Sequence, residues 1–255
     1  DNEWLVLEQL RESTDCLRSG VVCHRGHFIV DNANERSPHK RVPALLIDYV
    51  DGPDLFDFAR VWWDTKNQAP AATLARAIAK SCLSALAVVH SAGIAHRDIK
   101  PENIIVQFDP PDQTHSAIHN VRCTIVDFAY ACDEQTCATT RFSGTPCYAT
   151  AARLQSALDD NKRTEPDYAA FQREQAGDVW ALGLSLFFFF TGSQPWPCVV
   201  SSAIEEAKTP MPHAIAALAA FADRYSLLDH EHVAGDDSTL DNVLFQMLVP
   251  EDDMR

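Results

Sequence analysis

The sequence predicts an α+β fold, in which a small part rich in strands precedes a larger part that is mainly helical. Strand-like apolar runs come early, at Val21–Val30 and Val42–Val50. Helical spacing of apolar residues dominates later, beginning with Thr73–Ser91. The chain has 255 residues, and 46% of them are hydrophobic, which is enough to bury a sizeable core. We therefore expect two unequal lobes, residues 1–50 and residues 51–255.

A helix precedes the early strands, and a polar loop separates them. Leu7 and Leu10 lie on one helical face, which predicts a helix over Glu3–Leu10. The loop covers residues 32–40, which are almost entirely polar. After the second strand the pattern predicts a short helix at Asp54–Trp63, and the long Ala- and Leu-rich helix follows it.

The second part of the chain begins with two short strands and ends with helices. The strands are expected at Asn103–Phe108 and Val121–Val126, with a polar, proline-containing loop between them. Asp133–Arg163 has weak periodicity and predicts an ordered loop segment, with a polar extension over residues 154–175. Helical patterns then occupy three ranges: Val179–Thr191, Ala214–Ala222 and Leu240–Leu248.

Charge and hydropathy limit the partners that the chain can bind. The formal net charge of -15 disfavours sequence-independent binding to nucleic acid and to anionic membranes, and it favours basic partners. The longest apolar run, Ala181–Phe190, is too short to cross a bilayer. We expect this run to form a buried helix and the chain to have no membrane span.

The cysteines are scattered along the sequence. None forms a Cys-x-x-Cys pair, and the spacing from Cys132 to Cys137 fits no common zinc site. We therefore expect all of the thiols to be reduced, as in a cytoplasmic or nuclear protein. The eight positions are Cys16, Cys23, Cys82, Cys123, Cys132, Cys137, Cys147 and Cys198.

The string HRDIKPEN, residues 96–103, is the strongest chemical signal. It places Asp98, Lys100 and Asn103 in a loop between a long helix and a short strand. Phosphoryl transfer needs a carboxylate that orients the attacking hydroxyl, a cation on the moving phosphate and oxygen ligands for magnesium. These three side chains supply those groups in turn. Asp127, which follows the apolar residues CTIV, is placed to be a second metal ligand.

Five strings follow one another along the chain: LLIDYVDGPDLFDF, HRDIKPEN, VDFAY, GTPCY and DVWALG. With these strings in this order, the chain resembles the eukaryotic protein kinase family, serine/threonine branch. Within it, HRDIKPEN and DLFD are most similar to calcium/calmodulin-dependent or cyclic-nucleotide-dependent relatives. The resemblance implies a bilobal protein kinase-like fold, with a partial β-rich N-lobe and a mainly helical C-lobe. It also implies transfer of the γ-phosphate of ATP, with Mg²⁺, to serine or threonine hydroxyls of protein substrates.

The resemblance assigns roles to the residues of the catalytic site. Asp98 becomes the catalytic base, Lys100 contacts the transferred phosphate, and Asn103 and Asp127 bind the metal. His96 and Phe128 belong to the apolar stack that couples the lobes. The resemblance also implies contacts with the nucleotide, with Ile47 as gatekeeper and Ile105 under the adenine base. The residues concerned are Glu3, Ile47, Asp48, Val50, Asp54, Ile105 and Asp127. Asp54 is also placed to be an N-cap of the short helix, which is compatible with a contact to the ribose.

Substrate recognition and regulation follow from the same resemblance. Thr145, together with Lys100, is typical of serine/threonine rather than tyrosine kinases. Glu102 and Asp54 occupy positions that favour basic residues near the phosphoacceptor. Arg97 precedes the catalytic aspartate, where the family has an arginine that awaits a phosphate on the activation segment. Thr140 is the nearest acceptor, so phosphorylation there is our hypothesis, and an activation segment that is not phosphorylated is the alternative.

The sequence also departs from the family pattern. Neither a Gly-rich loop nor a Val-Ala-Ile-Lys strand is present, because the chain begins after both, so we expect a truncated N-lobe with negligible ATP turnover by this fragment alone. Ala129 replaces the glycine of Asp-Phe-Gly. Ala152 replaces the glutamate of Ala-Pro-Glu, whose partner would be Arg255. Together, the two alanines favour the alternative of a pseudokinase scaffold or allosteric partner, and the intact catalytic side chains oppose it. A small-molecule kinase of related fold is disfavoured by GTPCY.

Overall fold

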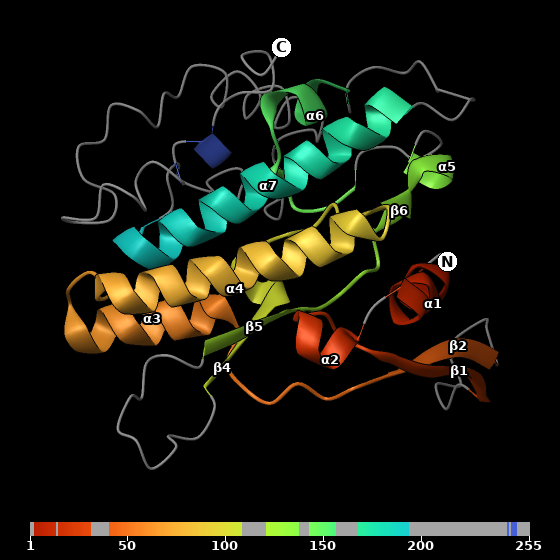
Figure 1. Ribbon diagram of the computed structural model, residues 1–255, viewed down its shortest axis with the longest axis horizontal. Coiled ribbons are helices and arrows are strands. Elements are labelled where there is room, and N and C mark those ends of the chain that lie inside the picture. Colours follow the sequence, from red (N-terminus) through yellow and green to blue (C-terminus); the bar gives the residue numbers. More distant parts are fainter. Residues whose placement is uncertain are drawn as a thin grey trace, which may run out of the picture.

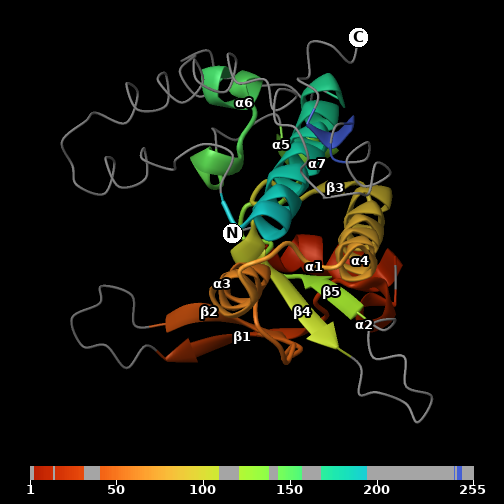
Figure 2. The same cartoon turned by 90° about the vertical axis from the view of Figure 1, so that its left-hand side faces the viewer.

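The computed structural model describes residues 3–13, 15–31, 41–108, 121–137, 143–156, 168–193, 244 and 246–248. Figure 1 shows a short helix and a two-stranded hairpin from the N-terminal residues on one side of the molecule, and three longer helices from later residues on the other. Two short strands lie between these groups, as the turned view in Figure 2 shows. The arrangement confirms the expected α+β class, with few strands and a helical second part.

The N-terminal helix and hairpin agree with the sequence pattern. Helix α1, Glu3–Ser13, buries Val6, Leu7 and Leu10 on one face. Strand β1, His24–Asp31, pairs antiparallel with β2, Arg41–Ile47. Both predicted strands are therefore present, although their ends differ from the prediction.

Strand β1 begins at His24 rather than at Val21 because the preceding residues have another partner. Helix α2, Cys16–Ser19, which the sequence analysis did not predict, ends at Gly20 in a left-handed conformation with φ 73°. Val21 then forms a bridge with Ile125, and the Val22 N–H donates to the Ile125 carbonyl at 3.1 Å. These residues are extended, but they lie beside a strand of the other part of the molecule.

Two predicted helices occur where the spacing placed them. Helix α3, Leu55–Lys66, begins after Asp54, and helix α4 spans Ala72–Ser91. Within the described part of the chain, α4 meets the length and composition of a membrane-crossing helix. Its apolar side chains lie in the core, so core packing accounts for its composition.

The short strands hold the segments that carry the HRDIKPEN and VDFAY strings. Strand β3, Ile94–Ala95, pairs with β6, Cys132–Asp133, and β4, Ile104–Phe108, pairs with β5, Val121–Ile125. The 3₁₀ turn η1, Pro101–Asn103, leads directly into β4. Residues 96–103 are therefore fixed at both ends by strand pairing.

The described part of the segment that was predicted as an ordered loop, Asp133–Arg163, contains short helical elements that the prediction missed. Helix α5 covers Glu134–Cys137, the 3₁₀ turn η2 covers Pro146–Tyr148 and α6 covers Ala151–Ser156.

Helix α7, Tyr168–Thr191, starts well before the predicted Val179. Its polar first half is helical because it has buried partners: Gln175 Nε2 donates to the carbonyls of His90 and Ile94, each at 3.2 Å. The predicted helix Ala214–Ala222, and most of Leu240–Leu248, lie outside the described residues.

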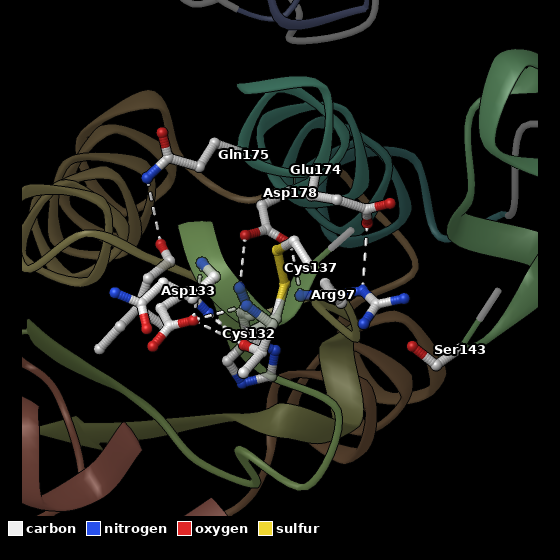
Figure 3. The surroundings of a disulfide bond; sticks show 12 residues. Arg97, Cys132, Asp133, Cys137, Ser143, Glu174, Gln175 and Asp178 are labelled. Atoms are coloured by element: carbon white, nitrogen blue, oxygen red, sulfur yellow. Dashed lines mark hydrogen bonds and ion pairs between the residues drawn. A yellow bond between two sulfur atoms is a disulfide. The ribbon is translucent and has the colours of Figure 1, made fainter. Parts of the chain in front are cut away.

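The prediction that every cysteine is reduced is also wrong. Cys132 and Cys137 form a disulfide that joins β6 to α5, shown in Figure 3, and Cys147 is disulfide-bonded as well. Cys132 and Cys137 are buried in a small cluster with Ala95 and Phe171. The expectation of a cytoplasmic or nuclear protein loses the support that it drew from reduced thiols.

Candidate active site

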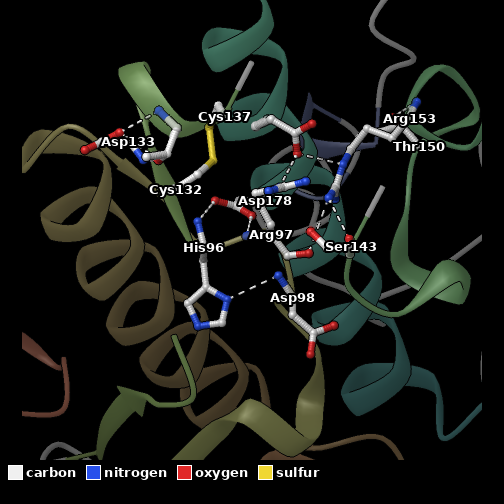
Figure 4. Close-up of polar contacts among 12 residues, drawn as sticks. His96, Arg97, Asp98, Cys132, Asp133, Cys137, Ser143, Thr150, Arg153 and Asp178 are labelled. Carbon is white, nitrogen blue, oxygen red and sulfur yellow. Dashed lines mark hydrogen bonds and ion pairs between the residues drawn. A yellow bond between two sulfur atoms is a disulfide. The ribbon is translucent and has the colours of Figure 1, made fainter. Parts of the chain in front are cut away.

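A buried aspartate on α7 holds the backbone of the HRDIKPEN loop. Asp178 accepts hydrogen bonds from the N–H groups of His96 and Arg97, each at 2.7 Å, as Figure 4 shows. Arg97 has φ 70°, a left-handed conformation that costs free energy for a residue with a side chain, so these bonds hold a strained turn. His90 contacts the same carboxylate through Nε2 at 3.1 Å. Burial opposes ionisation of Asp178, but the hydrogen bond and charge of His90 bring its pKa below the ordinary value.

His96 joins the HRDIKPEN loop to the VDFAY segment. Its Nδ1 accepts from the Asp98 N–H at 3.3 Å, so Nε2 carries the proton and donates to the Val126 carbonyl at 3.1 Å. The ring meets Phe128 edge-on with 4.7 Å between centroids. Burial lowers the pKa of His96, in agreement with a neutral ring. The two residues that the resemblance assigned to one apolar stack are therefore in contact.

Asp98, Lys100 and Thr145 form one polar cluster. Asp98 Oδ1 accepts from both the backbone N–H and the hydroxyl of Thr145, each at 2.7 Å. The Lys100 ammonium lies 3.0 Å from Asp98 Oδ2 and donates to the Thr145 hydroxyl oxygen at 3.2 Å. Thr145, which is 47 positions away in sequence, thus fixes one oxygen of the carboxylate, and Lys100 from the same loop lies against the other.

Gly144 permits the approach of the segment that carries Thr145. A Cβ added at Gly144 would lie 2.2 Å from the Arg97 carbonyl oxygen, and the residue has φ 99°. Only glycine fits both the space and this conformation. The glycine of GTPCY is therefore a structural requirement for the contact between Thr145 and Asp98.

The predicted metal ligands present oxygen atoms of the kind that magnesium prefers. Asn103 Nδ2 donates to the Asp98 carbonyl at 2.9 Å and to Asp98 Oδ2 at 3.2 Å, so its amide oxygen is the atom that could bind a cation. Asp127 is exposed and has φ 63°, a conformation that is uncommon for a residue with a side chain. The amide oxygen of Asn103 and the carboxylate of Asp127 are donors that fit a hard divalent cation.

Glu3 of α1 lies on the same side as Asp127. Burial, together with the negative charge of Asp127, raises the pKa of Glu3. A positive charge near both carboxylates would relieve this repulsion. The arrangement fits the predicted role of Glu3 near the nucleotide phosphates.

The predicted nucleotide residues between the lobes all lie within the described part of the chain. Asp54 Oδ1 caps α3 by accepting from the Asp57 N–H at 2.7 Å, and Asp54 also bridges to Ile105 of β4. Ile47 ends β2 and is exposed, and Val50 packs against the core. The Asp48 carboxylate binds Arg25 with two 2.6 Å hydrogen bonds, which the sequence pattern did not indicate. Glu102 is exposed in η1.

Ala129 fits its position without strain. Among the described residues with side chains, positive φ values occur at Asn67, Arg97 and Asp127, and Ala129 is not one of them. A glycine is therefore not required at this position in the observed conformation. The substitution that looked damaging in the sequence leaves Asp127 and Phe128 in place.

Sequence reasoning missed Glu174. Its carboxylate Oε2 accepts from Arg97 Nε at 3.2 Å, as Figure 3 shows, and lies 3.0 Å from Arg153 Nε. The signal was the spacing of four between Glu174 and Asp178, which places both on one face of a helix. It was overlooked because this stretch was read as a polar extension of the loop. Thr140, the expected phosphorylation site, and Arg255 lie outside the described residues.

Comparison with known proteins agrees with this geometry. The sequence model of the protein kinase domain matches residues 23–255. The chain belongs to the protein kinase domain family. Its fold is similar to that of the kinase PK-1 of Cydia pomonella granulovirus, with a TM-score of 0.60 and 17% identity over 100% of this chain and 75% of that one.

Curated relatives of this kinase domain are serine/threonine kinases. The phosphorylase b kinase gamma catalytic chain, liver/testis isoform, of Mus musculus is 29% identical over 198 residues, which are 76% of this chain and 43% of that protein. Serine/threonine-protein kinase RAD53 of Saccharomyces cerevisiae is 27% identical over 155 residues, 60% of this chain and 17% of that protein. The chain thus spans less than half the length of these relatives.

Proposed function

We propose that this chain is the catalytic part of a protein serine/threonine kinase that transfers the γ-phosphate of ATP to a hydroxyl of a protein substrate. The observation that carries the proposal is the cluster of Asp98, Lys100 and Thr145, in which the carboxylate and the ammonium are fixed side by side. A carboxylate next to a cation is what an attacking hydroxyl and a transferred phosphoryl group require. The serine/threonine kinases among the relatives support the reaction class.

Each residue of the cluster has a definite task in this reaction. Thr145 binds Asp98 Oδ1, whereas Oδ2 faces Lys100 and Asn103, the residues proposed to contact the phosphate and the metal. We therefore assign to Oδ2 the task of orienting the substrate hydroxyl and accepting its proton. The Lys100 ammonium, 3.0 Å from that oxygen, stabilises negative charge on the transferred phosphoryl group. The fixed positions of both groups avoid reorganisation during the reaction.

Asn103 and Asp127 would hold magnesium, which neutralises phosphate charge when it is bound. Asn103 is itself fixed by its two bonds to Asp98, so the metal ligand and the base are positioned as one unit. Glu3, whose pKa is raised by burial and by Asp127, would lie near the nucleotide phosphates. ATP and Mg²⁺ are therefore the proposed cosubstrate and cofactor.

Substrates with basic residues near the phosphoacceptor fit the charge of the chain. Glu102 is exposed and directly precedes Asn103, the proposed metal ligand. A basic side chain of a substrate bound at the active site could therefore contact the Glu102 carboxylate. Asp54 Oδ1 accepts a hydrogen bond from the Asp57 N–H, and its second oxygen could contact a basic residue together with Glu102. The formal net charge of -15 favours the approach of basic segments.

Phosphate transfer by the full-length protein, measured with radiolabelled ATP and basic peptides that contain serine or threonine, tests this function. We expect Asp98→Asn to lower kcat by about 10²- to 10⁴-fold, the usual range for loss of a positioned base. Asp127→Ala should remove detectable transfer. Asp64→Asn, which changes an exposed aspartate of α3, should have the wild-type rate. Equal signals from the wild type and from both site variants would contradict the proposal and favour a pseudokinase scaffold.

A further inference from the structure

One carboxylate on α7 serves two arginines that belong to different segments. Glu174 Oε2 lies 3.2 Å from Arg97 Nε and 3.0 Å from Arg153 Nε. The Arg97 and Arg153 side chains are only 3% and 7% exposed, and that of Glu174 is 20% exposed. A single acid therefore neutralises part of two buried positive charges.

The second arginine connects the HRDIKPEN loop to the segment that binds Asp98. Arg153 Nη2 donates to the Arg97 carbonyl at 3.3 Å and to the Ser143 carbonyl at 3.2 Å. Ser143 is two residues before Thr145, whose N–H and hydroxyl donate to the base. Contacts thus run from Glu174 through Arg153 to Ser143, and from there along the chain to Asp98.

The sequence of α7 makes room for this arrangement. A Cβ added at Gly177 would lie 2.8 Å from Arg153 Cδ, so glycine at this position admits the arginine stem. Glu174, Gly177 and Asp178 share one helical face, because they are separated by three and four residues. That face contacts the loop backbone through Asp178 and the two guanidinium groups through Glu174.

The negative charge of Glu174 offsets the repulsion between the two arginines. Burial is the main effect on the pKa of Arg97, and it lowers this pKa. The charge of Glu174 raises the pKa and repulsion from Arg153 lowers it, so it remains below its ordinary value. Without Glu174, two like charges would face each other in a poorly solvated space. A buried cation that has lost its partner is destabilised strongly and moves toward water. Displacement of either arginine would then disturb the loop or residues 143–145.

We propose that Glu174 is a positioning residue that supplies, from within the chain, the negative charge that aligns Arg97 and Arg153, and through them Asp98 and Thr145. The proposal rests on the proposed kinase activity. It assigns to a carboxylate of α7 the task that the sequence analysis gave to a phosphate on Thr140. Activity should then not depend on phosphorylation of the activation segment.

The test compares Glu174→Gln with Glu134→Gln in the full-length protein. Glutamine keeps the size of Glu174 and removes its charge, and Glu134 is an exposed glutamate of α5. We expect Glu174→Gln to lower kcat by about 10²-fold, the usual loss for a small misplacement of catalytic groups, with little change in the KM for ATP. Glu134→Gln should be wild-type in both parameters. Circular dichroism and the unfolding midpoint show whether each variant is folded.

Two further arms separate positioning from stabilisation alone. Glu174→Asp, which keeps the charge, should recover part of the lost kcat. Adding Arg153→Gln to Glu174→Gln should lower kcat by less than Arg153→Gln does alone, because both changes break the same chain of contacts. Wild-type protein treated with a phosphatase, and shown by mass spectrometry to lack phosphate, should keep its kcat.

The outcomes that overturn the proposal differ from those that overturn the kinase function. A folded Glu174→Gln protein with wild-type kcat would show that the carboxylate only stabilises the fold. Loss of activity on phosphatase treatment would show that an added phosphate, rather than Glu174, supplies the charge. A wild-type protein that transfers no phosphate would refute the kinase function, and this proposal with it.

Discussion

The HRDIKPEN loop with α7 and the β1–β2 hairpin differ in where their side chains find partners. In the loop, His96, Arg97 and Asp98 are all buried, and each is bonded to residues distant in sequence. In the hairpin, Phe28 and Ile29 are mostly exposed, although the two strands are paired along their length except for an irregularity between His24 and Gly26. Strand pairing thus contributes most to the shape of the hairpin, whereas buried polar contacts give the loop its shape.

Two aspartates show the same contrast. Asp178, buried under the loop, and Asp48, at the end of the hairpin, both have a pKa below the ordinary value of 3.8. For Asp178 the cause is the bond and charge of His90, which outweigh burial. For Asp48 it is the hydrogen bond from Arg25 at the surface. The direction of the shift is the same, but the free energy at stake is not, because water screens the second pair.

The largest effect is expected for Asp178→Asn. The amide would keep one acceptor oxygen for two backbone N–H groups, so one buried donor on a strained turn would lose its partner. We expect the free energy of unfolding to fall by about 3 kcal/mol and activity to be lost. Urea unfolding of the full-length protein measures the first, and Asp31→Asn, at an exposed position of β1, is the matched control. A variant as stable as the control would contradict the comparison.

The same aspartate predicts a pH dependence. Because folding lowers the pKa of Asp178, its ionised form stabilises the protein at pH values above 3.8, the ordinary pKa. This contribution is lost as the pH falls through the lower pKa of the folded state. Unfolding midpoints measured from pH 6 downward should therefore decline less in Asp178→Asn than in the wild type.

A pair of isoleucines sharpens the comparison for apolar residues. Ile125 of β5 is 0% exposed and Ile29 of β1 is 63% exposed. Ile125→Ala should cost about 3 kcal/mol of stability, because it removes buried methylene groups and leaves a cavity, whereas Ile29→Ala should cost well under 1 kcal/mol. Equal changes in the urea midpoints of the two variants would show that the hairpin is covered in the full-length protein.

The disulfide is expected to have an intermediate effect. It closes a short loop between β6 and α5, with a sequence separation of five. The double variant Cys132→Ala with Cys137→Ala should lose about 2 kcal/mol of stability, the entropic contribution of a loop of this size. A reductant alone would not isolate this effect, since Cys147 is disulfide-bonded as well. The double variant is therefore the decisive measurement, and an unchanged midpoint would contradict it.

The sequence predicted best those features that depend on local patterns. Helices α3 and α4 follow from spacing and from the cap at Asp54, and the catalytic cluster follows from an unusual string of residues. Thr145 fixes Asp98 from a second side. From the sequence, only the family resemblance indicated that Thr145 belongs to the site.

The features that the sequence did not predict depend on contacts between distant segments. The first half of α7 is polar, and its helical form is understood only from the partners of Glu174 and Gln175 on the loop and on α4. The pairing of Cys132 with Cys137 requires the turn from β6 into α5, which no periodicity indicates. Val21 and Val22 were read as part of β1, because an apolar run does not reveal which strand it will lie beside.

The smallest effect is expected at the surface pair of Asp48 and Arg25. Their two 2.6 Å hydrogen bonds have good geometry, but the Arg25 side chain is 48% exposed. Asp48→Asn should lower the urea midpoint less than any other variant here that removes a partner, and 1 M salt should remove most of the difference. The difference should also vanish as the pH falls through the lowered pKa of Asp48, because the wild-type carboxylate is then neutral. A loss as large as that of Asp178→Asn, insensitive to salt, would mean that the hairpin pair is buried in the full-length protein and that the two regions are alike.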